Sequence, residues 1–243
     1  MKMITWTSLE NEREEEERIK GDRAVSLTCP AREAEVEETV ASSNSSMAYR
    51  AIKRFSDIVI ALGGLLVFGL PILVIAFLVW REDKHSPIFK QERIGKGGKP
   101  FTLYKFRSMR IDAEKGGCPQ LCATEGQDPR LTKVGTFIRN HHLDEFPQLW
   151  NILRGDMSFV GYRPERQFFI DQIMEADSRY EELYEMRPGV FSEATLYNGY
   201  TDTLAKMLHR LEMDLDYIKS PSLMRDLSII WKTSLSILSF KKF

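Results

Sequence analysis

The densest group of polar side chains in this sequence lies between Arg139 and Gln148. Within it, Asp144 and Glu145 come just before a predicted helix, and Pro147 suits the first turn of that helix. Free N–H groups and the helix dipole favour negative charge at such a position. An ionised carboxylate there can attack an electrophile or hold a divalent cation. Alternatively, Asp144 caps the helix, which is a common role for aspartate.

Basic residues in short motifs accompany these carboxylates along the chain. Lys105 and Arg107 come from one motif, whereas Arg139 and Arg163 stand on either side of the acidic pair. Lys and Arg are the residues that bind pyrophosphate, and Arg can bind phosphate oxygens in a bidentate manner. Each of them could instead be a solvated surface charge. The sequence has no P-loop, and the glycines within Gly95–Gly98 fit a hairpin turn better than a nucleotide cradle.

Zinc catalysis is a poor match to the histidines and cysteines. His141 and His142 are adjacent, and neighbouring residues on a helix point about 100° apart, so the two are badly placed to share one ion. The sequence contains no H-E-x-x-H motif. Cys118 and Cys122 do not provide four zinc ligands, and together with Cys29 they make an odd number, which favours a reducing compartment.

The charge is distributed unevenly along the chain. The net charge is -1, but residues 1–46 contain 6 Lys and Arg against 11 Asp and Glu. This acidic stretch has few large apolar residues, and we expect a disordered tail there. The remainder is basic, which suits an anionic membrane surface or a phosphorylated substrate.

An uncharged segment of 23 residues runs from Ile58 to Trp80. As a straight helix it would reach roughly 35 Å, enough to cross a hydrocarbon core of about 30 Å. Pro71 has no N–H for the helical ladder and its ring clashes with the carbonyl of Val67, so we expect a break. Basic residues flank both sides, which favours a hairpin that enters and leaves the membrane on one face. The alternative is a spanning helix that tolerates the proline.

These patterns predict a small α/β domain associated with a membrane. We expect a tail over residues 1–46, a membrane hairpin over 47–85 and a catalytic domain over 86–243. Alternation and turn residues predict a β-hairpin from Ile88–Arg93 and Phe101–Phe106. Helices are expected over residues 131–142, 146–154, 165–186 and 203–218. Leu223–Phe243 mixes large apolar and basic residues, which suits an amphipathic helix in the membrane interface, or alternatively a core helix.

Several motifs in this order match a known family. They are Lys53-Arg54-Phe55-Ser56-Asp57, residues 87–95, Lys105-Phe106-Arg107-Ser108-Met109, residues 128–132, residues 143–149, residues 155–161, and Arg163-Pro164. With these motifs, the chain resembles the bacterial sugar transferases, also called monotopic phosphoglycosyl transferases, in their short form.

The resemblance implies an enzyme of the bacterial inner membrane with its catalytic domain on the cytoplasmic face. Such enzymes move a sugar phosphate from a nucleotide sugar, usually a UDP sugar, to a polyprenol phosphate such as undecaprenyl phosphate. They release UMP and begin the synthesis of a surface polysaccharide. The implied partners are these two substrates and membrane lipids, with no nucleic acid, and a homo-oligomer is an open option.

The resemblance also implies roles for individual residues. Asp144 would be the nucleophile that forms a phosphosugar ester, and Glu145 would assist proton transfer or acceptor activation. A Mg²⁺ ion would lie against Asp144 and the pyrophosphate. Arg139 and Arg163 would hold phosphate. Lys105 and Arg107 would line the site. Pro71 would mark the break in the re-entrant helix.

Three departures limit what the resemblance implies. Tyr162 stands where many members have proline, and the acidic tail of residues 1–46 lies outside the match. Residues 190–195 read Val-Phe-Ser-Glu-Ala-Thr in place of the common Ile-Thr-Gly, which leaves the sugar open. Two other functions stay open at this point, a metal-dependent hydrolase of lipid phosphates and an inactive membrane scaffold with the same fold.

Overall fold

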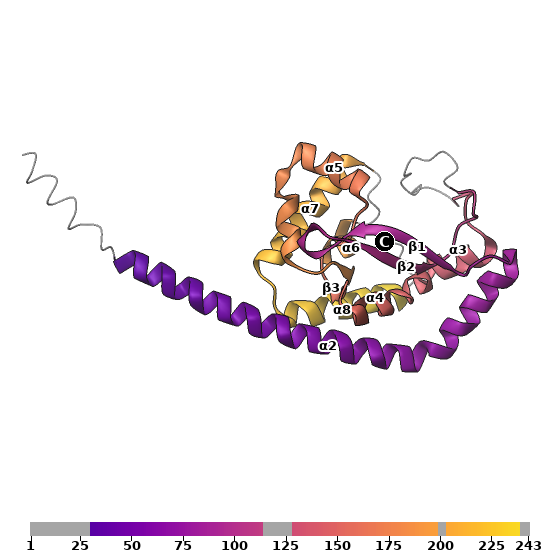
Figure 1. Ribbon diagram of the computed structural model, residues 1–243, viewed down its shortest axis with the longest axis horizontal. Coiled ribbons are helices and arrows are strands. Elements are labelled where there is room, and N and C mark those ends of the chain that lie inside the picture. The colour runs from indigo at the N-terminus through magenta and orange to yellow at the C-terminus, as the bar shows by residue number, and fades with distance from the viewer. Residues whose placement is uncertain (1–29, 114–127, 199–202, 239–243) are drawn as a thin grey trace, which may run out of the picture. The chain divides into compact units, whose positions relative to one another are not determined.

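The computed structural model describes residues 30–113, 128–198 and 203–238 of the chain (Figure 1). The chain divides into two units, Met1–Arg50 and Ala51–Phe243, and both sheets belong to the second. All three cysteines lie outside the described residues. Most of the expected acidic tail also lies outside them, but residues 30–46 are helical, because α2 begins at Pro30.

Helix α2 (Pro30–Asp83) contains the apolar segment. Its part Met47–Asp83 reaches a mean hydropathy of 2.9 and is long and apolar enough to cross a membrane. The helix continues through Pro71, so the structure does not show the predicted break in the helix at this residue. Figure 1 shows instead that α2 bends toward its C-terminal end, and a proline within a helix is a common cause of a bend.

Within the second unit, residues of α2 on both sides of Pro71 pack into the core. Before the proline, Ala61 is fully buried in a cluster with Ile152. After it, Val79 is buried in a cluster with Phe106 and Ile138. Helix α2 also carries more than half of the exposed large apolar side chains of the described chain.

The predicted β-hairpin is confirmed. Strand β1 (Ile88–Ile94) pairs antiparallel with β2 (Pro100–Phe106), so that Ile88 lies opposite Phe106. The turn η1 (Lys96–Gly98) joins them, and Gly97 and Gly98 have φ angles of 70° and 67°. Glycine adopts these left-handed angles without the steric cost that other residues meet.

Three short elements hold the polar run that contains the acidic pair. They are α3 (Lys133–Asn140), η2 (Leu143–Glu145) and α4 (Gln148–Arg154), which confirm the two predicted helices with shorter bounds. Thr132 caps α3 by accepting a hydrogen bond from the N–H of Gly135. A Cβ atom at Gly135 would lie 1.9 Å from the carbonyl oxygen of Ser108, so only glycine fits there.

A second small sheet was not expected from the sequence. Strands β3 (Ser158–Val160) and β4 (Gly189–Phe191) pair in parallel, with Ser158 opposite Gly189. The backbone at Gly189 lies very close to the backbone at Gly161. A Cβ atom added at Gly189 would be only 2.1 Å from the nitrogen of Gly161. Strands of three residues are too short to show an alternating pattern.

The prediction of one long helix over residues 165–186 is wrong. The chain forms α5 (Gln167–Ala176) and then a separate 3₁₀ helix, η3 (Ser178–Glu185). Asp177 is extended between them, and its side chain accepts a hydrogen bond from the N–H of Arg179. An aspartate that bonds to the backbone in this way starts a new helix in preference to continuing the old one.

The last helices are α6 (Glu193–Asn198), α7 (Leu204–Lys219) and α8 (Leu223–Leu238). Helix α7 confirms the prediction for residues 203–218, whereas α6 was not predicted. Helix α8 buries Ile229 on one face and exposes Met224, Leu227 and Trp231. It is therefore in part a core helix, and its exposed face is apolar as the interfacial prediction requires.

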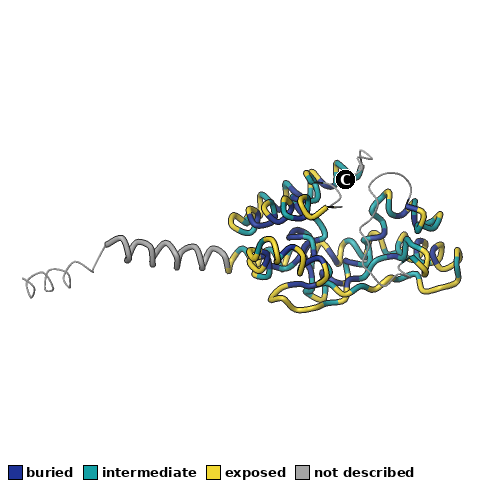
Figure 2. The backbone as a smooth tube through the Cα atoms, turned by 90° about the horizontal axis from the view of Figure 1, so that it is seen from above, coloured by how far each residue is buried: buried dark blue, intermediate teal, exposed yellow. Residues whose placement is uncertain are grey.

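The largest core cluster joins β1, α5, η3 and α7 around Tyr162. Its members include Ile170, Leu183 and Leu211. Figure 2 shows buried positions gathered in the interior of the second unit, with exposed positions along its outer turns. This core supports the loop between β3 and α5, which carries Arg163.

Candidate active site

Asp144 and Glu145 are the last two residues of η2, directly before Pro147 and α4. This confirms the predicted position ahead of a helix. The turn depends on His142, which has a left-handed φ of 54°. Asp144 is 8% exposed, so the site is nearly buried yet in contact with solvent.

The structure does not support a capping role for Asp144. The N-cap position of α4 is Pro147, which has no side-chain capping bond. Within the described residues, no hydrogen bond or ion pair engages the Asp144 carboxylate. Burial raises its pKa and the charge of Glu145 adds to this, while Lys105 and Arg139 oppose it. The carboxylate is thus available to a ligand.

Glu145 has the opposite environment. Its Oε1 atom is 2.7 Å from the ammonium nitrogen of Lys105 and 4.0 Å from Nη2 of Arg163. Burial alone would raise the pKa of Glu145, but these two cations outweigh it and lower the pKa to about 2. Lys105 lies on β2 and Arg163 follows β3, so two elements far apart in the sequence meet at this carboxylate.

Arg139 is placed at the same group by the last turn of α3. Its charge lowers the pKa of Asp144 and also that of Asp128. Asp128 forms a bidentate pair with Arg130, with one contact of 2.6 Å. Arg139 therefore lies near both the acidic pair and a second, internally neutralised carboxylate.

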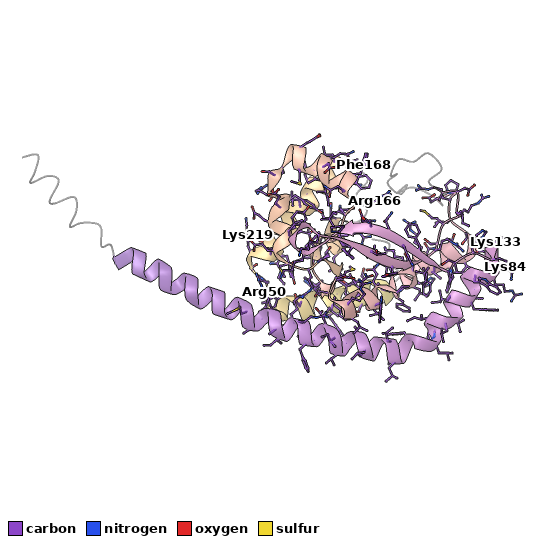
Figure 3. All side chains as sticks on the ribbon, in the orientation of Figure 1. Arg50, Lys84, Lys133, Arg166, Phe168 and Lys219 are labelled. Atoms are coloured by element: carbon purple, nitrogen blue, oxygen red, sulfur yellow. The ribbon has the colours of Figure 1, made fainter. Side chains whose placement is uncertain are left out.

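Arg107 is the predicted site residue that the described contacts place elsewhere. Its Nη2 atom is 2.6 Å from Oδ1 of Asp83, at the end of α2. The neighbouring Glu82 accepts hydrogen bonds from the N–H groups of residues 133 and 134, at the start of α3. Figure 3 shows Lys84 and Lys133 beside each other at this junction. The end of the apolar helix is thus fastened to both elements that flank the site.

A resident metal ion would need oxygen ligands from this group. Among the described residues, no cluster of three His, Cys, Asp or Glu could hold a metal by itself. Magnesium ordinarily takes only one or two carboxylates, with the substrate phosphates as further ligands. Asp144 fits this requirement because no other described residue hydrogen-bonds to its carboxylate, whereas Glu145 is already bound to Lys105.

The pattern of these residues agrees with a comparison to known proteins. A model that describes the bacterial sugar transferase family matches residues 48–240. This range includes the whole site and the apolar part of α2.

The chain belongs to the bacterial sugar transferase family.

Individual relatives of this transferase support the assignment. A Bacillus subtilis (strain 168) protein is 50% identical over 130 residues, which are 54% of this chain and 71% of that protein. A UDP-glucose:undecaprenyl-phosphate glucose-1-phosphate transferase of Caulobacter vibrioides is 38% identical over 77% of this chain and 70% of its own length. A UDP-N-acetylgalactosamine-undecaprenyl-phosphate N-acetylgalactosaminephosphotransferase of Aeromonas hydrophila is 37% identical over 84% of this chain but only 47% of its own length.

The first family motif of the transferase fastens α2 to other elements of the second unit. Lys53 pairs with Asp226 of α8 at 2.6 Å. Arg54 donates to the carbonyl oxygen of Ile152 at 2.6 Å, at the end of α4. Asp57 accepts from the N–H of Phe159 at 3.1 Å. Lys53, Arg54 and Asp57 therefore bind three different elements, α8, α4 and β3.

Tyr162 and Ser192 show how the fold accommodates two of the departures from the family pattern. Tyr162 is fully buried in the large core cluster. Ser192 accepts from the N–H of Thr195 at 2.9 Å and so caps α6. Both departures are accommodated by local packing or capping.

Sequence reasoning missed a buried group next to Arg163. Glu165 pairs with Arg93 of β1 and Arg210 of α7, and Asp214 lies one turn after Arg210. The spacing of four residues between Arg210 and Asp214 puts both on one face of α7. That signal is equally typical of a solvated helix surface, so the sequence alone could not single it out.

Proposed function

We propose that this transferase moves a sugar 1-phosphate from a UDP sugar to undecaprenyl phosphate and releases UMP. The observation that carries the proposal is the pair of unlike carboxylates, one open at Asp144 and one neutralised at Glu145. The names of the Caulobacter and Aeromonas relatives specify this reaction for two different sugars. We expect the reaction to begin a surface polysaccharide.

Asp144 is the nucleophile in this account. Its carboxylate oxygen attacks the phosphorus atom that bears the sugar, the bond from that phosphorus to the bridging oxygen breaks, and UMP leaves. The phosphate oxygen of undecaprenyl phosphate then attacks the same phosphorus atom and releases Asp144. Two displacements at one site suit a domain that meets a soluble nucleotide and a lipid in turn.

The cations neutralise the charge that resists this attack. Arg139 and Arg163 can bind phosphate oxygens, because the guanidinium group matches them with two parallel donors. The incoming pyrophosphate competes with Glu145 for Lys105, and a Glu145 relieved of that partner can accept a proton from the acceptor phosphate. A Mg²⁺ ion held by Asp144 and the pyrophosphate would supply further direct neutralisation of charge.

We further propose that α2 is a re-entrant hairpin in the inner membrane, with the catalytic unit on the cytoplasmic face. Its early part is fastened to the unit at Lys53 and its end at Asp83. A straight helix between these residues would be about 45 Å long, more than the hydrocarbon core of about 30 Å. Its two ends could not then contact one domain on one side of the bilayer.

UMP release tests the catalytic proposal. Purified enzyme is incubated with a panel of UDP sugars, with and without undecaprenyl phosphate, and the nucleotide product is measured. We expect UMP and a lipid-linked sugar phosphate from one or a few sugars, and none of either from Asp144→Asn. Excess EDTA should stop turnover. Phosphate release from the lipid without any nucleotide sugar would indicate the alternative, a lipid-phosphate hydrolase.

Site-directed labelling tests the membrane proposal. Single cysteines are introduced as Ala48→Cys and Lys84→Cys after the three native cysteines are replaced. Both should react with an impermeant thiol reagent only from the cytoplasmic side. Labelling of the first site from the outside would support a spanning helix.

A further inference from the structure

The approach of Arg163 to the acidic pair depends on how its backbone is held. Its guanidinium is 4.0 Å from Glu145, and its side chain is 37% exposed, so close packing does not fix the side chain by itself. The residue lies in a short connection between β3 and α5. What sets the direction of the side chain is therefore the position of residues 163–165.

Three hydrogen bonds hold the backbone of these residues. The N–H of Arg163 donates to the carboxylate of Asp214 on α7. The carbonyl oxygen of Pro164 accepts from Arg93 on β1 at 3.1 Å. The carbonyl oxygen of Glu165 accepts from the N–H of Ile94 at 3.1 Å. Each consecutive residue is thus tied to β1 or α7.

A buried ionic group reinforces these bonds. The two oxygens of Glu165 pair separately, one with Arg93 at 3.0 Å and one with Arg210 at 2.6 Å. Glu165, Arg210 and Asp214 are 9%, 6% and 4% exposed. Burial of so many charges is expensive, and apolar residues of similar volume are often equally stabilising. A requirement other than stability would explain why charged groups occupy this place.

We propose that Asp214 and Arg93 are positioning residues that hold the backbone of Arg163 so that its guanidinium meets the phosphate at the acidic pair. The inference rests on the proposed transferase reaction. Neither residue contacts the acidic pair itself in the structure. Both act through Arg163, and their contribution should vanish when Arg163 has no guanidinium.

A double-mutant cycle separates positioning from simple stabilisation. Asp214→Ala and Arg93→Lys are each made in the wild type and in Arg163→Ala, and kcat/KM for UMP release is measured with the preferred UDP sugar. Arg93→Lys keeps a charge beside Glu165 but loses the planar fork that also reaches Pro164. Asp214→Asn keeps an oxygen that can accept the N–H of Arg163. Glu212→Ala is the control, because Glu212 lies on the same helix but pairs with Arg179 at the surface.

We expect Asp214→Ala and Arg93→Lys each to lower kcat/KM about tenfold in the wild type, as one hydrogen bond of this kind predicts. In Arg163→Ala, the same changes should lower it less than about threefold. Asp214→Asn should retain activity near that of the wild type, as should Glu212→Ala. Thermal unfolding identifies any variant that fails to fold, and Arg93→Lys, which removes no charge, then carries the test.

Equal losses in both backgrounds would overturn the positioning role and leave the proposed reaction intact. The proposal also fails if Asp214→Asn loses as much as Asp214→Ala. Failure of the wild type to release UMP from any UDP sugar would instead contradict the proposed function. The two failures are therefore distinguishable in one set of assays.

Discussion

Asp144 and Glu145 are adjacent in the sequence, but the fold shifts the pKa values of their carboxyl groups in opposite directions. Burial raises the pKa of Asp144, whereas Lys105 and Arg163 overcome burial at Glu145 and lower its pKa to about 2. The pair thus presents one carboxylate that is open to a ligand and one that organises the cations. The structure brings Lys105, Arg139 and Arg163 to the pair, and their phosphate-binding roles stay predictions. Arg107 instead donates to Asp83, which is 24 residues away.

In the proposed reaction, the arginines act through their shape as well as through their charge. Arg163→Lys and Arg139→Lys keep the positive charge but lose the planar pair of donors. We expect each change to lower kcat/KM about tenfold, the value of one charge-assisted hydrogen bond. Arg154→Lys is a suitable control, because Arg154 is half exposed and faces Asp156. Unchanged kinetics in the first two variants would remove bidentate phosphate binding from the account.

The pH dependence of stability should report on Asp214. Burial raises the pKa of this carboxyl from 3.8 to about 7, and Glu165 adds to the effect, while Arg210 and the N–H of Arg163 oppose it. Between these values the folded state holds a proton that the unfolded state has released, so stability falls as the pH rises. We expect the thermal midpoint of the wild type to fall relative to Asp214→Asn between about pH 5 and pH 7. A difference that stays constant over this range would contradict the shift.

At the scale of elements, the sequence predicted those helices and strands that have a local pattern of their own. The hairpin and the helices around the acidic pair were found from alternation, turn glycines and Pro147. Strands β3 and β4 were not predicted, because three residues are too few to show an alternating pattern. The helix break at Asp177 was not predicted, because a charged surface helix tolerates aspartate. In the structure, the hydrogen bond from the N–H of Arg179 to the Asp177 side chain shows that a new helix starts there.

The anchoring of α2 to the catalytic unit can be tested at Asp57. Its carboxylate accepts from the hydroxyl of Ser158 and from the N–H of Phe159, each at 3.1 Å. Asp57→Ala leaves a backbone N–H without that partner, which should lower the free energy of unfolding by about 1–3 kcal/mol. Ser56→Ala is the matched control, because among the described residues Ser56 bonds only to the carbonyl of Ile52 in its own helix. The comparison is made by thermal unfolding in detergent, and equal midpoints would show that the motif does not anchor α2.

The bend in α2 should depend on Pro71. A proline in a helix interior costs about 3 kcal/mol, so Pro71→Leu favours a straight helix by a similar amount. A straight α2 would lose contacts such as those of Ile75 and Val79 with Phe106. We expect the enzyme's activity to fall. We also expect a fraction of the molecules to span the membrane, with the residues before the apolar segment accessible from the outer side. Full activity with unchanged labelling would show that the bend is imposed by packing alone.

At the scale of the whole molecule, an exposed apolar surface and a group of charged residues lie in one unit. The exposed apolar side chains of α2 and α8 suit contact with membrane lipids, while the acidic pair and its cations suit phosphates. The sequence predicted this division from the uncharged segment and the basic remainder. It could not predict how the parts meet, because Lys53 and Asp226, or Lys105 and Glu145, are far apart in the chain.

The central claim is that Asp144 carries the sugar phosphate between the two substrates. Intact-protein mass spectrometry tests it after the enzyme is incubated with the preferred UDP sugar and no acceptor. We predict an added mass of one sugar phosphate, its loss when undecaprenyl phosphate is supplied, and no adduct on Asp144→Asn. An adduct that persists in Asp144→Asn, or an enzyme that releases UMP without ever gaining mass, would contradict the account.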